Sequence, residues 1–233
     1  TFGSNCPSDF KISSIKSNGT GSQMVCQTSK EQKVSCKFNF WHKHLMVNAL
    51  GVVTVFIELE LDLLNGIQAL EEWSPIEGRG LVYKLELLNE PSNSRLLLID
   101  DSYNSNPISL RSSLENFIRF EDFYASNKNV LTRLAILGDM LELGEDSINQ
   151  HTKIADLMSF KKIDKICCVG HYMKYLYNEL PLVQRAGYYE STNDLLSNIN
   201  ELIKNVDLVL VKGSNSFNFS RVIEKIKSIG KIC

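Results

Sequence analysis

The stretch Leu96-Leu-Leu-Ile-Asp-Asp-Ser-Tyr-Asn-Ser-Asn-Pro107 decides the fold class of this 233-residue chain. Its continuous apolar run ends in two carboxylates, and a loop of amide and hydroxyl side chains follows. Such a run is typical of a buried parallel strand whose carboxyl end opens into a ligand site. The pattern recurs in Leu134-Ala-Ile-Leu-Gly-Asp-Met-Leu-Glu-Leu-Gly144. We therefore expect two strands to deliver polar loops to the same edge of one sheet.

Strands and helices are predicted to alternate on both sides of these two runs. Strands are predicted over residues 81–88, 95–100, 132–137, 165–169, 187–189 and 207–211. Helices are predicted over residues 108–120, 147–160, 171–178, 192–204 and 216–228. Alternation at this spacing predicts βαβ units, and hence an α/β fold with a mostly parallel sheet.

The beginning of the chain follows a different pattern. Residues 8–41 are rich in Ser, Lys, Thr and Gln and contain short alternating stretches, which predict antiparallel strands with one wet face. The apolar segment 44–65 is long enough to favour a helix. Pro75, Gly78 and Gly80 interrupt the pattern within residues 66–80, so we predict a domain boundary there.

Composition excludes several classes of protein. A formal net charge of -2 leaves no basic footprint for nucleic acid or for an anionic membrane surface. No apolar run approaches the roughly 18 residues of a membrane span. The six cysteines form no Cys-x-x-Cys pair, and adjacent Cys167 and Cys168 are interpreted as small buried hydrophobes. This cysteine usage favours the reducing cytoplasm, and no nucleic-acid or membrane partner is expected.

Known nucleotide and metal motifs are also missing from the sequence. No Gly-x-Gly-x-x-Gly follows a predicted strand, and no Gly-x-x-x-x-Gly-Lys-Ser/Thr is present. His42, His151 and His171 have no acidic or cysteine partners at the spacing of a metal site or a catalytic triad, so we interpret them as surface or packing residues. No catalytic residue and no metal ligand is assigned.

The motifs that are present resemble those of the Mur ligases of peptidoglycan synthesis. Asp101-Ser-Tyr-Asn-Ser-Asn-Pro107 is similar to the family's Asp-Ser-Tyr-Asn-Ala-Asn-Pro signature, and Leu137-Gly-Asp-Met-Leu-Glu-Leu-Gly-Glu145 to its Leu-Gly-Asp-Met-x-Glu-Leu-Gly-Glu signature. Gly78-Arg79 and Lys212-Gly-Ser214 stand where the family has Gly-Arg and Lys-Gly-Ser. The segment from Ser216 to Phe219 resembles a variant found in bifunctional ligase/alanine racemase proteins.

Within the family, the resemblance is greatest to members that add D-alanyl-D-alanine to UDP-N-acetylmuramoyl-tripeptide. It implies that residues 1–72 form the end of a central ATP-binding domain and residues 75–233 a carboxyl-terminal Rossmann-like domain. It also implies ATP and Mg²⁺ as cofactors, with the Mg²⁺ ligands in an absent part of the same polypeptide, and an acyl-phosphate intermediate. The chain by itself is expected to be inactive. Another Mur or folylpolyglutamate-type ligase, or a non-catalytic α/β binding module, remains an alternative.

The resemblance assigns some residues to the nucleotide. Asp101 would accept hydrogen bonds from ribose hydroxyls, although an acid or Ser before Pro107 could also cap the next helix. Arg79 would stack on adenine or pair with a phosphate, and its alternative is a solvated linker arginine. His44 and Asn48 resemble a family element that packs against adenine, but Leu45 replaces its first Asn.

Other residues are assigned to the peptide and the dipeptide. Tyr103, Asn104 and Asn106 would offer amide and hydroxyl groups, although Asx-rich loops are also ordinary turns. Asp139 and Glu142 are also assigned to substrate binding, and the alternative is that they belong to a solvated charged loop. Lys212 would suit an incoming carboxylate or phosphate at the end of its strand. Asn215 replaces the arginine that the family usually carries, which puts an anion contact there in doubt.

Overall fold

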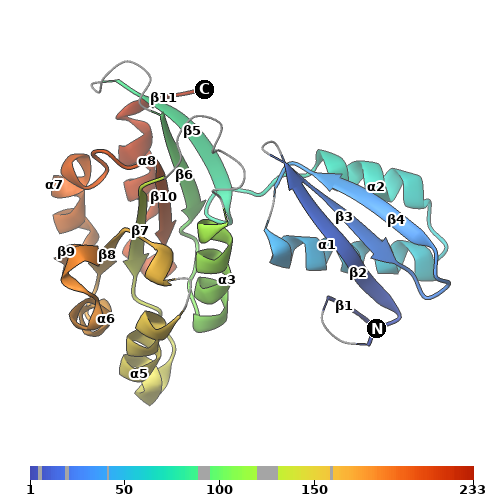
Figure 1. Cartoon of the computed structure of the whole chain (residues 1–233), viewed down its shortest axis with the longest axis horizontal. Coiled ribbons are helices and arrows are strands. Elements are labelled where there is room, and N and C mark those ends of the chain that lie inside the picture. Colours follow the sequence, from blue (N-terminus) through green and yellow to red (C-terminus); the bar gives the residue numbers. More distant parts are fainter. Residues whose placement is uncertain (5–6, 19–20, 41, 89–94, 120–130, 158–159) are drawn as a thin grey trace. The chain divides into compact units, whose positions relative to one another are not determined.

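The computed structural model describes residues 1–4, 7–18, 21–40, 42–88, 95–119, 131–157 and 160–233. The chain divides into two compact units, whose described parts fall within residues 1–75 and within residues 76–119 and 131–233. We call them the first and the second unit and describe each by itself (Figure 1). Among the described helices, none combines the length and the hydropathy that crossing a bilayer would require.

In the described residues, the first unit is a four-stranded sheet with two helices. Its strands follow the order β1-β2-β3-β4, with β1 parallel to β2 and the other pairs antiparallel. Alternate residues of β4 are buried, so the predicted antiparallel strands with one wet face are confirmed. The bounds are β1 Phe2–Gly3, β2 Phe10–Asn18, β3 Gly21–Gln27, β4 Lys33–Phe38, α1 Lys43–Glu58 and α2 Leu63–Glu72.

The single helix predicted over residues 44–65 is wrong, because two helices occupy this region. Glu60 adopts a left-handed conformation with φ 52° after α1 ends. Asp62 then caps α2 by accepting hydrogen bonds from the backbone N–H groups of Leu64 and Asn65. The second helix continues to Glu72, so it takes up the first part of the predicted boundary segment 66–80.

The second unit is built on a seven-stranded sheet with the order β11-β5-β6-β10-β7-β8-β9. Strands β6, β10, β7, β8 and β9 are parallel, whereas β5 and β11 are antiparallel to their neighbours. The predicted α/β fold with a mostly parallel sheet is therefore confirmed. The bounds are β5 Leu81–Leu87, β6 Arg95–Asp101, β7 Arg133–Gly138, β8 Lys165–Val169, β9 Arg185–Tyr189, β10 Leu208–Lys212 and β11 Gly230–Ile232.

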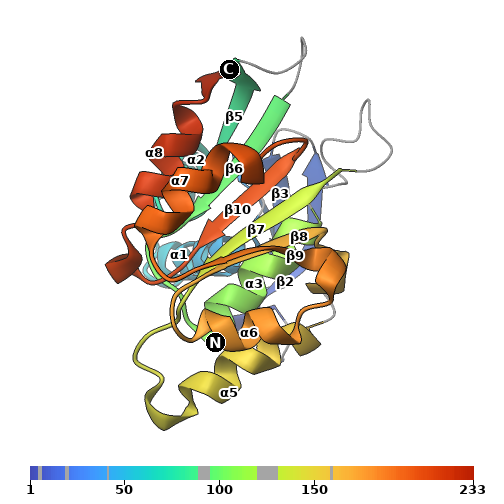
Figure 2. The same ribbon diagram turned by 90° about the vertical axis from the view of Figure 1, so that its left-hand side faces the viewer.

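Helices cover both faces of this sheet. Helices α7 and α8 lie on one face and α3 on the other (Figures 1 and 2), while α5 and α6 pack against each other beside β8. The bounds are α3 Pro107–Ile118, α5 Ser147–Thr152, α6 Met173–Glu179, α7 Thr192–Leu202 and α8 Ser220–Lys227. This two-sided cover explains why β7 and β10 are buried along their whole length and are apolar except for Arg133 and Lys212 at one end of each.

Two helix predictions need correction, and one strand was not predicted. The helix predicted over residues 147–160 ends at Thr152, and a 3-10 turn follows it. The helix predicted over residues 216–228 begins only at Ser220, because Asn218 adopts a left-handed conformation with φ 49°. The three-residue strand β11 was not predicted, because a strand this short has no periodicity to detect.

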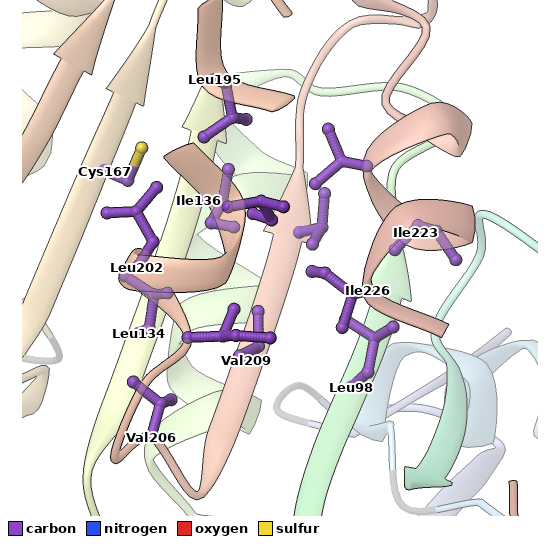
Figure 3. Packing of buried hydrophobic residues seen from close by; sticks show 14 of the residues in the cluster. Leu98, Leu134, Ile136, Cys167, Leu195, Leu202, Val206, Val209, Ile223 and Ile226 are labelled. Carbon is purple, nitrogen blue, oxygen red and sulfur yellow. The ribbon is translucent and has the colours of Figure 1, made fainter. Parts of the chain in front are cut away.

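An apolar cluster of the second unit lies between the sheet and helices α7 and α8 (Figure 3). Leu98, Val209 and Leu134 face it from β6, β10 and β7, and Leu195 and Ile223 meet them from the two helices. Because side chains alternate along a strand, the next residues along each strand face α3. This alternation decides which polar groups at the strand ends share a face.

Candidate functional site

The site is built from the carboxyl ends of three adjacent parallel strands. In the register of the sheet, Lys212 at the end of β10 lies beside Asp101 of β6 and beside Leu137 of β7. The two motif loops, which follow β6 and β7, therefore lie on either side of β10. The expectation that both loops reach one edge of one sheet is confirmed.

Asp101 and Lys212 form an ion pair on the α3 face of the sheet. The Lys212 Nζ lies 2.9 Å from Asp101 Oδ2 and donates a second hydrogen bond, 3.0 Å long, to the backbone carbonyl of Asn104. The Ser113 hydroxyl, presented by α3, donates to the same Asp101 oxygen. The side chain of Lys212 is 2% exposed and that of Asp101 is 19% exposed. Only the carboxylate of this pair can therefore be reached from solvent.

Asp100 points to the opposite face and holds the turn that carries Arg79. Its Oδ2 accepts from the Gly78 N–H at 2.8 Å, and its Oδ1 accepts from the Ser102 hydroxyl at 2.6 Å and the Ser102 N–H at 3.2 Å. The Asp100 backbone carbonyl also accepts from the Gly80 N–H at 2.7 Å. Sequence reasoning did not assign Asp100, although the alternation of a strand separates two adjacent aspartates.

Arg79 and Tyr103 lie against each other. The Arg79 guanidinium carbon is 4.3 Å from the centroid of the Tyr103 ring, within the range of a cation–π contact. The Tyr103 N–H donates to the Gly78 carbonyl at 3.0 Å, which ties the two loops together. Arg79 thus lies against an aromatic side chain of the protein, and its assignment to the nucleotide stays a prediction. Both side chains are exposed.

Asn104 and Asn106 are exposed, and each already uses its side-chain oxygen. Asn104 Oδ1 accepts from the Ser105 N–H at 2.8 Å. Asn106 caps α3, since its Oδ1 accepts from the Ser109 N–H at 2.8 Å and its own N–H donates to Ser109 Oγ. This is a reciprocal capping box. Their side-chain amide groups remain exposed to a ligand, so the assignment to the peptide site stays a prediction.

The loop after β7 is held by Asp139 from inside. Its carboxylate is buried and accepts from the Met173 N–H at 2.7 Å and the Tyr172 N–H at 3.2 Å, at the beginning of α6. Gly170 has φ 112°, and a Cβ there would lie 2.6 Å from the carboxylate. Burial raises the pKa of Asp139, while the backbone hydrogen bonds lower it. This placement favours a role in positioning the loop, whereas Glu142 is exposed on the same loop with φ 63°.

His151 supports the same loop and was assigned no role from the sequence beyond surface or packing. It is fully buried, its Nε2 accepts from the Met140 N–H at 2.9 Å, and its ring stacks on Tyr172 with centroids 5.4 Å apart. Nδ1 lies 2.6 Å from the Ser147 carbonyl. Since Nδ1 must donate there, the neutral Nδ1–H tautomer fits both contacts. Burial lowers the pKa of His151 and so favours this neutral form.

His44 and Asn48 belong to the first unit. Both are exposed in the first two turns of α1, four residues apart, and so lie on one face of the helix. The His44 ring is 5.6 Å from that of His42. Their assignment to adenine stays a prediction.

A separate pocket of about 130 Å³ lies in the second unit, between the Gly78 turn and the beginning of α8. Glu77, Tyr83, Asn215 and Glu224 are among its lining residues. Burial, followed by the charge of Glu77, raises the pKa of Tyr83 to about 12. Its charged lining residues are all carboxylates, so the pocket suits hydrogen-bond donors better than a phosphate. Across the part of the chain that the structure describes, no group of three or more His, Cys, Asp or Glu side chains could hold a metal ion.

Comparison with known proteins identifies the second unit. The family model described as "Mur ligase, glutamate ligase domain" matches residues 85–215, which span both motif loops and Lys212. The chain belongs to the Mur ligase family. The resemblance inferred from the motifs is therefore confirmed.

Curated relatives and solved structures agree with this membership. The UDP-N-acetylmuramoyl-tripeptide–D-alanyl-D-alanine ligase of Rickettsia prowazekii is 27% identical over 185 residues, which cover 79% of this chain and 38% of the relative. The ligase of the same name from Bacillus subtilis is 24% identical over 233 residues, 97% of this chain and 46% of the relative. This Mur ligase chain thus spans less than half the length of these relatives.

Two solved structures show the same fold. MurF from Acinetobacter baumannii matches with a TM-score of 0.74 and 20% identity, covering 97% of this chain and 46% of that one. MurF from Thermotoga maritima in complex with ADP matches with a TM-score of 0.73 and 18% identity, covering 97% and 48%.

Proposed function

We propose that this Mur ligase chain is part of an ATP-dependent amide ligase that adds D-alanyl-D-alanine to UDP-N-acetylmuramoyl-tripeptide. The observation that carries the proposal is the group formed by Asp101, Asn104 and Lys212, which joins two family motifs at the ligand-binding edge of the sheet. The names of the curated relatives support this substrate pair.

The proposed reaction has two steps. ATP first phosphorylates the carboxylate of the nucleotide-bound tripeptide, which gives an acyl phosphate and ADP. The amine of D-alanyl-D-alanine then attacks the acyl carbon, an amide bond forms, a proton leaves the nitrogen and inorganic phosphate departs. Such transfers depend on positioning and on stabilising developing negative charge.

The described residues would divide between the two substrates. On the nucleoside side, Asp101 would accept from the ribose hydroxyls and Arg79 would face the base or a phosphate. On the acceptor side, the loops around Asn104 and Glu142 would face the dipeptide. A carboxylate reachable from solvent and two exposed polar loops support this division.

The remaining parts of the proposal concern the intact protein. Residues 1–72 would be the end of the ATP-binding domain, with His44 and Asn48 toward adenine, and residues 75–233 the carboxyl-terminal domain. The described residues offer no cluster for Mg²⁺, and its ligands would lie in the part of the relatives that this chain does not span. A cytoplasmic location, where ATP is supplied, belongs to the same proposal.

The test is an assay of the intact protein for phosphate release from ATP with UDP-N-acetylmuramoyl-tripeptide, with and without D-alanyl-D-alanine. Release that needs both substrates is expected. Release with a single amino acid instead of the dipeptide would indicate another Mur or folylpolyglutamate-type ligase. No release with any acceptor would leave a non-catalytic module.

A substitution of Asp101 tests the assignment of this residue to the nucleotide. Asp101→Ala in the intact protein is expected to raise the KM for ATP at least tenfold, because it removes the acceptor for the ribose hydroxyls. An unchanged KM for ATP would contradict the nucleotide assignment. The 233-residue chain assayed alone is expected to show no turnover.

A further inference from the structure

Lys212 is a buried cation at a place where the sequence suggested a ligand-facing one. It ends the apolar strand Leu208-Val-Leu-Val-Lys212, and its side chain is only 2% exposed. A buried ammonium is tolerated when its hydrogen bonds are satisfied by a charge partner and polar groups. The Asp101 carboxylate at 2.9 Å and the Asn104 carbonyl at 3.0 Å meet this requirement. The Lys212 ammonium therefore binds groups of the protein itself.

The contact to Asp101 makes the two carboxylate oxygens different. Oδ2 accepts from both Lys212 and the Ser113 hydroxyl, whereas Oδ1 accepts from none of the described residues. Two donors on one oxygen fix the rotation of the carboxylate. With 19% of the side chain exposed, Oδ1 is the oxygen available to a hydroxyl donor.

The contact to Asn104 reaches the other half of the site. The loop after β6 is anchored before Asn104 by the Tyr103 N–H bond to Gly78 and after it by the Asn106 cap on α3. Lys212 holds the segment between these anchors by its backbone carbonyl. Replacing the Asn104 side chain would leave this contact in place, since only the main chain is used.

We propose that Lys212 is a positioning residue that couples the two halves of the site, orienting Asp101 for the nucleoside and the Asn104 loop for the acceptor with one ammonium. The inference rests on the proposed function. It replaces the assignment from the sequence, in which Lys212 binds a substrate directly. It follows that removing the ammonium disturbs both substrates, although Lys212 contacts neither.

The experiment compares Lys212→Met, Asp101→Asn and the double variant in the intact protein. The KM values for ATP and for D-alanyl-D-alanine, kcat, and the Kd for ADP without turnover are measured. Lys204→Met, on an exposed side chain in the turn after α7, is the control and is expected to match the wild type. Lys212→Met is expected to raise both KM values at least fivefold, and Asp101→Asn only that for ATP.

The double variant separates positioning from direct binding. Because Lys212 acts on the nucleotide through Asp101, the double variant should have the same KM for ATP and the same Kd for ADP as Asp101→Asn alone. If the fold-changes of the two single variants in the KM for ATP and the Kd for ADP multiply in the double variant, this result would overturn the proposal. So would a Lys212→Met variant that raises only the KM for the dipeptide, as direct binding predicts, or one that lowers kcat with both KM values unchanged, as a purely structural role predicts.

Ser113→Ala covers the case in which Lys212→Met does not fold. It removes the second donor to Asp101 Oδ2 without burying a charge, and is expected to raise the KM for ATP two- to fivefold with the dipeptide KM unchanged. An unchanged KM for ATP would count against the oriented carboxylate. Wild-type protein that neither binds ADP nor releases phosphate would refute the proposed function itself, whereas active wild type with an unaffected Lys212→Met would refute only the role of Lys212.

Discussion

At the scale of single residues, Asp100 and Asp101 carry the same side chain one position apart, yet the pleat of β6 sends them to opposite faces of the sheet. Asp100 is 3% exposed, and its carboxylate is occupied by groups of Gly78 and Ser102. Asp101 keeps one oxygen without a partner among the described residues. Asp100 therefore serves the structure of the turn, and Asp101 is the one suited to a ligand.

The close approach of Gly78 to Tyr103 gives a residue-scale prediction. Gly78 has φ 75°, and a Cβ there would lie 2.9 Å from Tyr103 Cβ and 3.2 Å from its backbone nitrogen. Gly144 is the control, with φ 59° and no atom within 4 Å of its added Cβ. Gly144→Ala is expected to cost about 1 kcal/mol for the left-handed conformation. Gly78→Ala should cost at least about 1 kcal/mol more, measured by urea unfolding, and equal losses would contradict the steric argument.

His151 gives a second residue-scale prediction. Because burial lowers its pKa, the unfolded chain takes up a proton before the folded chain does as the pH falls. Stability is therefore lost from about pH 6.5, the ordinary histidine value, down to the folded pKa. Asp139, which faces His151, has a raised pKa and acts in the opposite sense, since its contribution is lost as the pH rises above about 3.8.

The measurement compares urea unfolding of the chain at pH 7.5 and pH 5.5. His151→Gln keeps an acceptor and a donor but does not titrate, so it should lose less stability between these pH values than the wild type. His171→Gln changes an exposed histidine and is the control. A His151→Gln variant with the wild-type pH dependence would show that another group causes the loss.

At the scale of elements, the cap of α3 tests which role Asn106 plays. Asn106→Ala removes a capping box and is expected to cost about 1 kcal/mol of unfolding free energy. Asn106→Ser restores a capping oxygen and should recover most of it. If the intact Asn106→Ser protein also keeps its KM for the dipeptide, the side chain is only a cap. A raised KM with restored stability would support the predicted ligand contact.

At the scale of the whole molecule, each unit has its own apolar cluster, and this predicts separate unfolding. Leu50 is fully buried in the cluster of the first unit and Leu134 in that of the second. Each substitution to Ala should cost about 2–5 kcal/mol. Leu50→Ala should lower only one of two thermal transitions and Leu134→Ala only the other, as followed by calorimetry. Equal shifts of a single transition would contradict two independent cores and the predicted division at residues 72–75.

The sequence by itself determined the fold class, the family, and the strands of the second unit to within about two residues, except for β11. Apolar runs that end in carboxylates and glycines require a sheet covered on both faces, and this is a local property of the chain. Local signals were less informative where one residue decides the break, as at Glu60 between α1 and α2. There the left-handed residue and the Asp62 cap outweighed the apolar pattern.

Only the tertiary structure decided how the site residues are paired. Lys212 meets Asp101 because β10 inserts between β6 and β7, and Ser113 meets it because α3 packs on that face. His151 reaches the Met140 N–H in the same way, through the packing of α5. Strand order and helix packing depend on long-range burial over the whole sheet, and no local pattern at Lys212 distinguishes a buried partner of Asp101 from a lysine that faces a ligand.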